Sequence, residues 1–313
     1  MPTAERAAWA VLAAADGLGP VGFNALLRQH GSGAAILAEV ASTGGMERLA
    51  ATPMGEPIAG GPARCLGRVV AASIADAAQR SADTIRRIDE IGLQVVTTAD
   101  TAYPHRLASI DMPPHVLFVL GDPHALDARS SVAVVGTRHA TDAGRSFAAR
   151  LAASLVSVGC TVVSGLATGI DGSAHAATVH AGGTTLAVIG SGHASLFPRV
   201  HERLAGMIVA SGGAIVSELA PDVHPTRGTF PRRNRVISGL ADATVVVEAP
   251  ARSGALITAS WALEQGRECF IVPGPVDARA SAGCLAFLRE FPGSARMVAG
   301  IPQLIEDLGL AHQ

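Results

Sequence analysis

The chain has 313 residues, 49% of them apolar and 16% charged, which is typical of a globular protein with one large and one small domain. Its formal net charge is −2, and all 24 of its lysine-or-arginine positions are arginine. The lack of lysine excludes sites that depend on a P-loop or Schiff-base lysine, so an anion site here must use guanidinium groups, backbone N–H groups or helix N-termini.

The sequence carries no sign of membrane insertion or secretion. No apolar run reaches about 18 uninterrupted residues, and the N-terminal residues MPTAERAAWA lack the basic and apolar regions of a secretory signal. We therefore expect a cytoplasmic protein that does not contact a membrane. The four cysteines form no C-x-x-C pair, and Cys160 and Cys269 lie in apolar, strand-like runs, which predicts buried free thiols. The sequence indicates no metal site, cofactor or catalytic residue.

Residues 1–91 are predicted to form a helical domain. Apolar side chains recur about every 3.6 residues in three segments that glycine and proline separate. The break at Gly17–Gly22, GLGPVG, is either a simple turn, which is the commoner outcome, or a hairpin whose N–H groups bind a phosphate. After a Gly/Pro-rich stretch at residues 51–62, one long helix is predicted over residues 63–91.

Residues 92–313 are predicted to form an α/β domain. Eight short runs rich in β-branched residues follow one another, and those from Val132 to Pro273 are strongly apolar and mostly separated by segments of helix length. Strands that are buried on both faces have this pattern, so we predict a doubly wound parallel sheet. Ligands of such sheets bind beyond the carboxyl ends of the strands, so the loops after these strands are the expected location of a site.

The loop after the run VAVV reads Gly136-Thr137-Arg138, and Thr141 is placed to cap the next helix. A guanidinium group beside backbone N–H groups at a helix N-terminus makes an anion clamp. An ordinary strand-to-helix turn with a solvated arginine accounts for these residues equally well.

The next such loop begins with Ser164 and Gly165 and leads to Asp171 and His175, which lie four residues apart on one helical face. These two side chains are either an acid/base pair or a local ion pair with an N-terminal capping role. We favour the ion pair, because no nucleophile is evident beside them.

Two later loops carry weaker signals. Gly190–Gly192 begins a dinucleotide fingerprint, but Ser195 stands where the last glycine belongs, which argues against NAD. Arg252, Ser253 and Gly254 again place a guanidinium group and N–H donors at a helix start, or form only a capped helix with a surface arginine.

The run RGTFPRRNR concentrates positive charge in a nearly neutral chain. A charge run is commonly a solvated face, but an aromatic residue among arginines suits a base stacked beside a phosphate backbone. Several anion-binding loops at one sheet edge fit a polymer of phosphates, so we predict nucleic-acid binding through local charge. We expect Asn234 and Arg235 to be candidates for internal hydrogen bonds. The candidates in this run are Arg227, Phe230, Arg232, Arg233, Asn234 and Arg235.

A series of motifs over about Tyr103–Leu288 resembles the DNA-processing protein A (DprA/Smf) family. They are GTRHATDAG, VVSGLATGIDGSAH, GTTLAVIGSG, TFPRRNRVISGL, VVVEAPARSGALITA and GRECFIVPG. The resemblance implies an extended Rossmann-like fold that binds single-stranded DNA, preceded by a helical region like a sterile alpha motif. It also implies a non-enzymatic homodimer that protects incoming DNA during natural transformation and loads the RecA recombinase onto it. Many members carry a C-terminal winged helix, which we do not expect before Gln313.

The resemblance also assigns residues by position. The family's phosphate-binding arginine corresponds to Arg138, its basic residue three before the FP motif to Arg227, and its base-contacting aromatic residue to Phe230. The pairs Ser164-Gly165 and Ser253-Gly254 are expected to line the same pocket. Arginine at position 227 keeps the charge of the family's common lysine but changes its geometry.

Other positions depart from the family pattern. Phe197-Pro198 replaces the usual Tyr-Pro, and Ser281–Leu285 lacks the usual asparagine. The alternative function is a nucleotide-binding or phosphoribohydrolase-like enzyme on a related fold, but the region SGALITA lacks the glutamate that such an enzyme needs. The apolar tract Ala278–Phe291, predicted to be rich in loops, is a candidate dimer surface.

Overall fold

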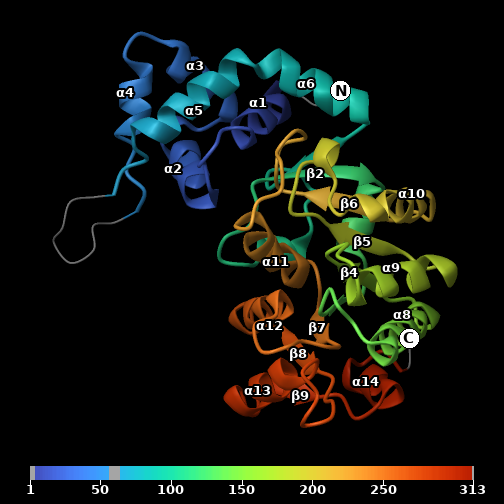
Figure 1. The fold of residues 1–313 in the computed structure, drawn as a ribbon. Helices are drawn as coiled ribbons and strands as arrows, with labels where there is room; N and C mark the ends of the chain where they lie inside the picture. Colours follow the sequence, from blue (N-terminus) through green and yellow to red (C-terminus); the bar gives the residue numbers. More distant parts are fainter. Residues whose placement is uncertain (1–3, 56–63, 312–313) are drawn as a thin grey trace.

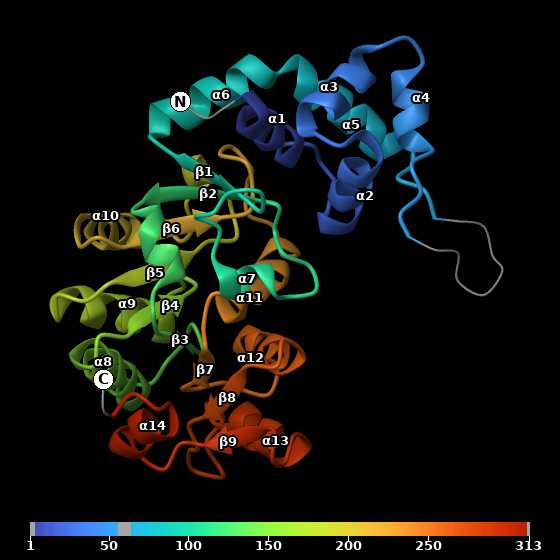
Figure 2. The same ribbon diagram turned by 180° about the vertical axis from the view of Figure 1, so that it is seen from behind.

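The computed structural model describes residues 4–55 and 64–311 (Figures 1 and 2). Within this part, helices precede the first strand, as the apolar spacing predicts. They are α1 (Ala4–Ala13), α2 (Pro20–His30), α3 (Gly33–Ala41), α4 (Gly45–Ala50), α5 (Arg68–Gln79) and α6 (Ser81–Ile91). Most of the Gly/Pro-rich stretch expected at residues 51–62, from residue 56 on, lies outside the described residues.

The single helix predicted over residues 63–91 is wrong in two respects, and the first is that α5 begins only at Arg68. The second is a break within the predicted range. The helical segment is interrupted at Arg80, whose φ of −94° and ψ of 14° lie in the bridge region and end α5 before α6 begins. Helix spacing alone does not reveal such a break, because the residues on both sides keep their helical pattern.

The helical region and the sheet share apolar contacts. Trp9 and Leu12 of α1, Phe23 of α2 and Ile74 of α5 belong to one buried cluster that also contains Phe118 of the second strand. The helices therefore cover the edge of the sheet at which the strand order begins (Figure 1). The division of the chain into domains at residue 91 stays a prediction.

A nine-stranded sheet forms the centre of the described structure, in the order β1-β2-β6-β5-β4-β3-β7-β8-β9. The strands from β6 to β9 in this order are parallel, whereas β1 and β2 are antiparallel to their neighbours. The predicted α/β class and the eight predicted strands are confirmed, and β9 was missed. The strands are β1 (Gln94–Thr97), β2 (Val116–Gly121), β3 (Ser131–Val135), β4 (Thr161–Ser164), β5 (Thr185–Val188), β6 (Ala214–Ser217), β7 (Ala243–Val246), β8 (Glu268–Ile271) and β9 (Ala295–Met297).

Helices cover both faces of this sheet, as expected of a doubly wound fold (Figures 1 and 2). One face carries α8 (Asp142–Ser157), α9 (Ile170–His180), α10 (Glu202–Ala210) and α14 (Ile301–Asp307). The other carries α7 (His105–Ala108), α11 (Thr229–Gly239), α12 (Gly254–Glu264) and α13 (Ala282–Glu290). Short 3-10 turns lie at Pro123–Asp127, His193–Ser195 and Arg199–His201. The tract 278–291, predicted to be rich in loops, is largely α13.

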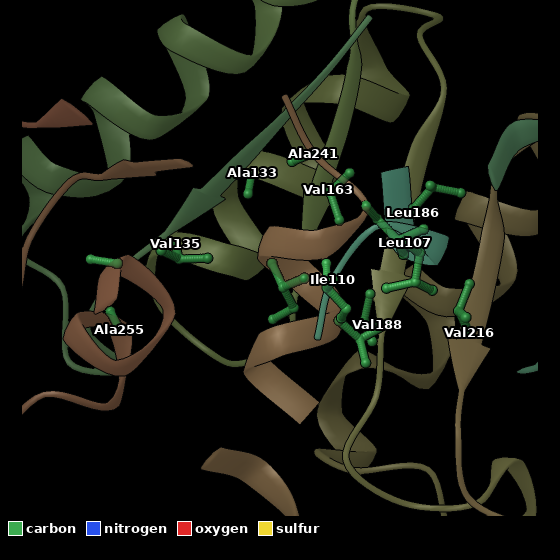
Figure 3. Close-up of a cluster of buried hydrophobic side chains, with 14 of the residues drawn as sticks. Leu107, Ile110, Ala133, Val135, Val163, Leu186, Val188, Val216, Ala241 and Ala255 are labelled. Carbon is green, nitrogen blue, oxygen red and sulfur yellow. The ribbon is translucent and has the colours of Figure 1, made fainter. Parts of the chain in front are cut away.

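The side chains of each central strand alternate between two apolar clusters. In β3, Ala133 and Val135 belong to the cluster under α11 and α12, while Val132 and Val134 belong to the cluster under α8 and α9. Figure 3 shows part of the first cluster, in which Ala133 and Val135 appear together with Leu107 and Ile110. Burial on both faces explains why these strands read as continuous apolar runs.

The strand order places a crevice at one edge of the sheet. β3 pairs with β4 on one side and with β7 on the other, so the chain leaves β3 and β7 toward opposite halves of the sheet. This is the topological switch point at which ligands of open α/β sheets bind. The loops that follow β3 and β7 therefore form the expected site.

Two smaller predictions were also tested. Cys160 and Cys269 are buried and form no disulfide, which confirms the prediction for these thiols. In the part of the chain that the structure describes, no helix has the length and apolar character needed to cross a bilayer.

Candidate nucleic-acid interface

A pocket of about 290 Å³ lies at the carboxyl edge of the sheet, between the loops after β3 and β7 and the first turns of α11 and α12. It brings together nine of the residues predicted from sequence, although they come from three separate segments. They are Gly136, Thr137, Arg138, Phe230, Arg233, Asn234, Arg252, Ser253 and Gly254. Their role in binding DNA stays a prediction.

The loop after β3 is held rigidly by the strand-end acid Glu248. The backbone N–H of Thr137 donates to the Glu248 carbonyl oxygen at 2.7 Å. The Glu248 carboxylate accepts from the N–H of Thr141 at 3.0 Å and from its hydroxyl at 2.5 Å. The Thr141 hydroxyl also accepts from the N–H of Gly144, which confirms Thr141 as the N-cap of α8. Glu248 is thus a positioning residue that the sequence did not reveal.

Arg138 is exposed at the mouth of this pocket and stacks on an aromatic ring. Its guanidinium carbon lies 5.0 Å from the centroid of the Phe230 ring, within the range of a cation–π contact. None of the ion pairs in the described part of the chain involves Arg138. Its positive charge is therefore available to a ligand, beside a face on which a base can stack.

Arg233 lines the pocket, and much of its hydrogen-bonding capacity is directed to the protein. Its side chain donates to the carbonyl oxygen of Gly165 at 2.8 Å, to that of Val188, and to the side-chain oxygen of Asn234. Burial lowers the pKa of Arg233 to about 10, so it stays charged at neutral pH. Arg233 is therefore a largely enclosed positive charge beneath the pocket, and its contact with DNA stays a prediction.

Asn234 and Arg235 make internal hydrogen bonds, as expected from the sequence. The Asn234 amide donates to the Gly254 carbonyl oxygen at 3.0 Å. Arg235 is 4% exposed and pairs with Glu218 at 2.6 Å. The assignment of Arg235 to a DNA-contacting surface is wrong, because its guanidinium group is enclosed by protein. Asn234 acts by tying α11 to the start of α12.

Two predicted pocket residues lie behind the pocket wall. Ser164 is fully buried, and its hydroxyl donates to the Val134 carbonyl oxygen at 2.6 Å. At Gly165 an added Cβ would lie 2.8 Å from the Arg233 guanidinium nitrogens. The expectation that these two residues line the pocket is corrected, since the Gly165 carbonyl supports Arg233 and the Ser164 hydroxyl ties β4 to β3. Ser253 caps α12, accepting from the N–H of Ala255 at 3.3 Å.

The remaining arginines of the run point to different places. Arg227 is exposed in the loop before α11. Arg232 is also exposed but lines a separate groove of about 250 Å³ together with the Gly17–Pro20 turn. Its guanidinium group would lie 3.7 Å from a Cβ added at Gly19. Arg232 therefore lies outside the pocket around Arg138.

The predicted pairing of Asp171 with His175 is wrong. The Asp171 carboxylate turns back to the preceding loop and accepts from the N–H groups of Gly165 at 3.2 Å and Ala167 at 3.4 Å. Burial raises its pKa, against the opposing effect of the Arg233 charge. His175 instead hydrogen-bonds to the Thr185 hydroxyl at 2.7 Å. Neither side chain is arranged for acid/base chemistry.

His175 predicts a specific pH dependence of stability. Complete burial lowers its pKa from 6.5 to about 3, so below about pH 6.5 the unfolded chain binds a proton that the folded chain does not. The free energy of unfolding is therefore expected to fall as the pH drops from about 6.5 to about 3. The decrease due to His175 is about 1.4 kcal/mol per pH unit.

Urea unfolding at about pH 6, 5 and 4 measures this slope. The His175→Gln variant is expected to lose less stability per pH unit than the parent protein, while His139→Gln, at an exposed histidine, keeps the parent slope. Equal slopes for the parent and His175→Gln would show that His175 does not stay neutral in the fold.

The described residues contain no cluster of three or more His, Cys, Asp or Glu side chains that is able to hold a metal ion. A mostly parallel sheet whose switch point carries an arginine stacked on an aromatic ring defines a doubly wound α/β protein with a candidate anion-binding site. The model of the DNA recombination-mediator protein A family matches residues 94–309, so the chain belongs to that family. The family expected from the motifs is confirmed.

Relatives agree with this membership. Protein Smf of Escherichia coli K12 is 46% identical over 206 residues, covering 66% of this chain and 54% of that protein. DNA processing protein DprA of Bacillus subtilis is 37% identical over 219 residues, covering 70% of this chain and 72% of its own length. This chain thus spans about half the length of the E. coli relative.

Two solved structures share the fold. The DNA processing protein A of Streptococcus pneumoniae superposes with a TM-score of 0.75 at 26% identity, covering 98% of this chain and 99% of that one. The protein of the same name from Helicobacter pylori, whose structure describes a single-stranded DNA binding mode, has a TM-score of 0.61 at 26% identity. It covers 70% of this chain and 97% of its own. The first match includes the N-terminal helices.

Proposed function

We propose that this protein binds single-stranded DNA without reading its sequence, at the pocket around Arg138 and Phe230. The observation that carries the proposal is the Arg138 guanidinium stacked on the Phe230 ring at the switch point, without a protein carboxylate as partner. A phosphate and the adjoining base need such a pair of groups side by side. The single-stranded DNA binding mode described for the Helicobacter pylori relative supports the same ligand.

Each candidate residue in or near the pocket has a distinct role in this proposal. Exposed Arg138, Arg227 and Arg252 bind phosphates of the backbone, and the charge of buried Arg233 adds to the positive potential beneath them. Phe230 stacks a base, which is worth about 1–3 kcal/mol for any base because every base has a π-face. Contacts of this kind favour an unpaired strand, whose bases are accessible, over a duplex.

We infer the wider role from family membership. The protein would protect incoming single strands during natural transformation and load the RecA recombinase onto them, acting in the cytoplasm as a homodimer. It would do so without catalysis, because Asp171 and Glu248 are both committed to hydrogen bonds that position loops. Accelerated displacement of a single-strand binding protein by RecA, in the presence of this protein, is the corresponding measurement.

The double substitution Arg138→Ala/Arg227→Ala tests the proposed site. Loss of two phosphate contacts should weaken binding of all single-stranded sequences alike and lower the slope of log affinity against log salt by about 1.4. Gel shifts of single-stranded and duplex oligonucleotides at two or more salt concentrations measure both effects. Arg86→Ala, which removes an exposed arginine on α6, is the control. Unchanged affinity in the double variant would reject the site.

A further inference from the structure

A second aromatic ring continues the surface that Phe230 begins. Phe197 lies in the loop after β5, and its ring centroid is 5.7 Å from that of Phe230 at an interplanar angle of 54°. This tilted contact leaves no room for a base between the two rings, so their outer faces form one continuous aromatic surface. Phe197 is 43% exposed, so part of its ring is accessible to a ligand.

Phe197 also lines a larger cavity. This cavity has a volume of about 890 Å³, the size of sites that hold small organic ligands, and lies between the loop at residues 193–199 and α10. Its wall includes the aliphatic side chains of Leu120, Leu196 and Val209. The hydrogen bond from Ser195 to His224, at 3.0 Å, ties the two loops that border it.

The charges around this cavity do not suit phosphate. Arg199 is balanced by Glu202, and both line the cavity. His193, which lines the cavity as well, is neutral, because burial lowers its pKa to about 4. Its Nε2 hydrogen-bonds to the Ile215 carbonyl oxygen at 3.0 Å. A mainly apolar cavity without net charge, lined in part by an exposed aromatic ring, suits nucleobases better than phosphates.

We propose that the single strand continues from Phe230 onto Phe197, and that the cavity behind Phe197 receives the bases that follow. This inference rests on the proposed function, and it adds a site that contacts bases but no phosphate. It also explains how a chain of net charge −2 holds a polyanion: the arginines fix the backbone at one end, and apolar surface holds the bases beyond them.

The Phe197→Ala substitution tests the site through two readouts. Loss of one base stack should lower the affinity for oligothymidylate of about 16 nucleotides by about 5- to 100-fold, because alanine substitution at a stacking residue has this effect. The salt slope should stay at the parent value, since no phosphate contact is lost. A short oligothymidylate of about 4 nucleotides, which occupies only the pocket around Phe230, should bind the parent and the variant more nearly alike.

Matched variants separate stacking from folding. Met207→Ala removes an apolar side chain with the same exposure, 43%, that does not line the cavity, and should bind as the parent does. Phe197→Leu keeps the apolar contact with Phe230 but not the flat ring, and should bind weakly, whereas Phe197→Trp should restore binding. Fluorescence of the tryptophan in Phe197→Trp should change when oligothymidylate is added.

The outcomes distinguish the two proposals. If the parent protein binds no single-stranded DNA, the proposed function itself fails. If the parent binds but folded Phe197→Ala and Phe197→Leu bind the longer oligonucleotide with parent affinity, the Phe197 site is refuted and the pocket around Arg138 stands. A reduced salt slope in Phe197→Ala would also overturn the proposal of a Phe197 site, because such a slope would mean that phosphate contacts depend on this ring.

Discussion

Replacing Arg235 with methionine is expected to lower the free energy of unfolding by about 3–5 kcal/mol, because it strands a buried carboxylate. Arg235 and Glu218 pair at 2.6 Å, with side chains only 5% and 12% exposed. Without the guanidinium group, Glu218 must either stay charged in a poorly solvated place or take up a proton, and both destabilise the fold. Urea unfolding of Arg235→Met at neutral pH measures the loss.

An ion pair on the surface with the same N···O distance provides the control. Arg145 and Asp142 also lie 2.6 Å apart, but their side chains are 46% and 99% exposed. Arg145→Met should cost about 1 kcal/mol or less, since water replaces the lost partner. The double variant Arg235→Met/Glu218→Leu removes both buried charges and should regain most of the lost stability. If Arg235→Met lowers the free energy of unfolding no more than Arg145→Met does, the buried ion pair does not contribute significantly to stability.

The central strands were predictable because a strand that is buried on both faces has a continuous run of apolar residues in its sequence. The run SVAVV of β3 lies between two layers of helices, so both of its faces had to be apolar. β9 has no such run, since it has three residues and one of them is Arg296. The antiparallel pairing of β1 and β2 depends on how the chain returns between them, which apolar spacing does not encode.

The pocket was predictable only as a location. Carboxyl ends of parallel strands meet at one edge, so loops after β3 and β7 had to lie close together. Which arginines serve it was not predictable, because consecutive residues of a helix point about 100° apart. On α11 this sends Arg232 to the groove beside Gly19, Arg233 beneath the pocket and Arg235 into the interior. The number of arginines in the run RGTFPRRNR is therefore larger than the number whose guanidinium groups are exposed at the pocket.

Gly169→Ala is expected to displace the loop that carries Arg138 without changing any residue that we propose to contact DNA. Gly169 has φ +82° and ψ −124°, a conformation that essentially only glycine adopts readily. A Cβ there would lie 2.8 Å from the Arg138 carbonyl oxygen and closer still to that of Thr137. Both atoms belong to backbone, so the loop that carries Arg138 has to move away from α9.

The expected result is a loss of about tenfold or more in affinity for single-stranded DNA, together with about 1–3 kcal/mol of stability. The first follows because a charged hydrogen bond to phosphate is worth about 1.5–3 kcal/mol, and the second from the strained backbone. Anisotropy titrations with labelled oligothymidylate measure affinity, and urea unfolding measures stability. The slope of log affinity against log salt should fall, as expected for loss of the Arg138 phosphate contact.

Gly182, just beyond the other end of α9, separates strain from displacement. It also has a positive φ, +71°, but no atom lies within 4 Å of an added Cβ. Gly182→Ala should therefore lose stability through backbone strain while its DNA affinity and salt slope stay at parent values. If Gly169→Ala also kept parent affinity, the position of Arg138 would not govern binding, and phosphate would have to be held by Arg227 and Arg252 instead. The two glycines thus test whether the close approach of α9 to the loop after β3 sets the geometry of DNA binding.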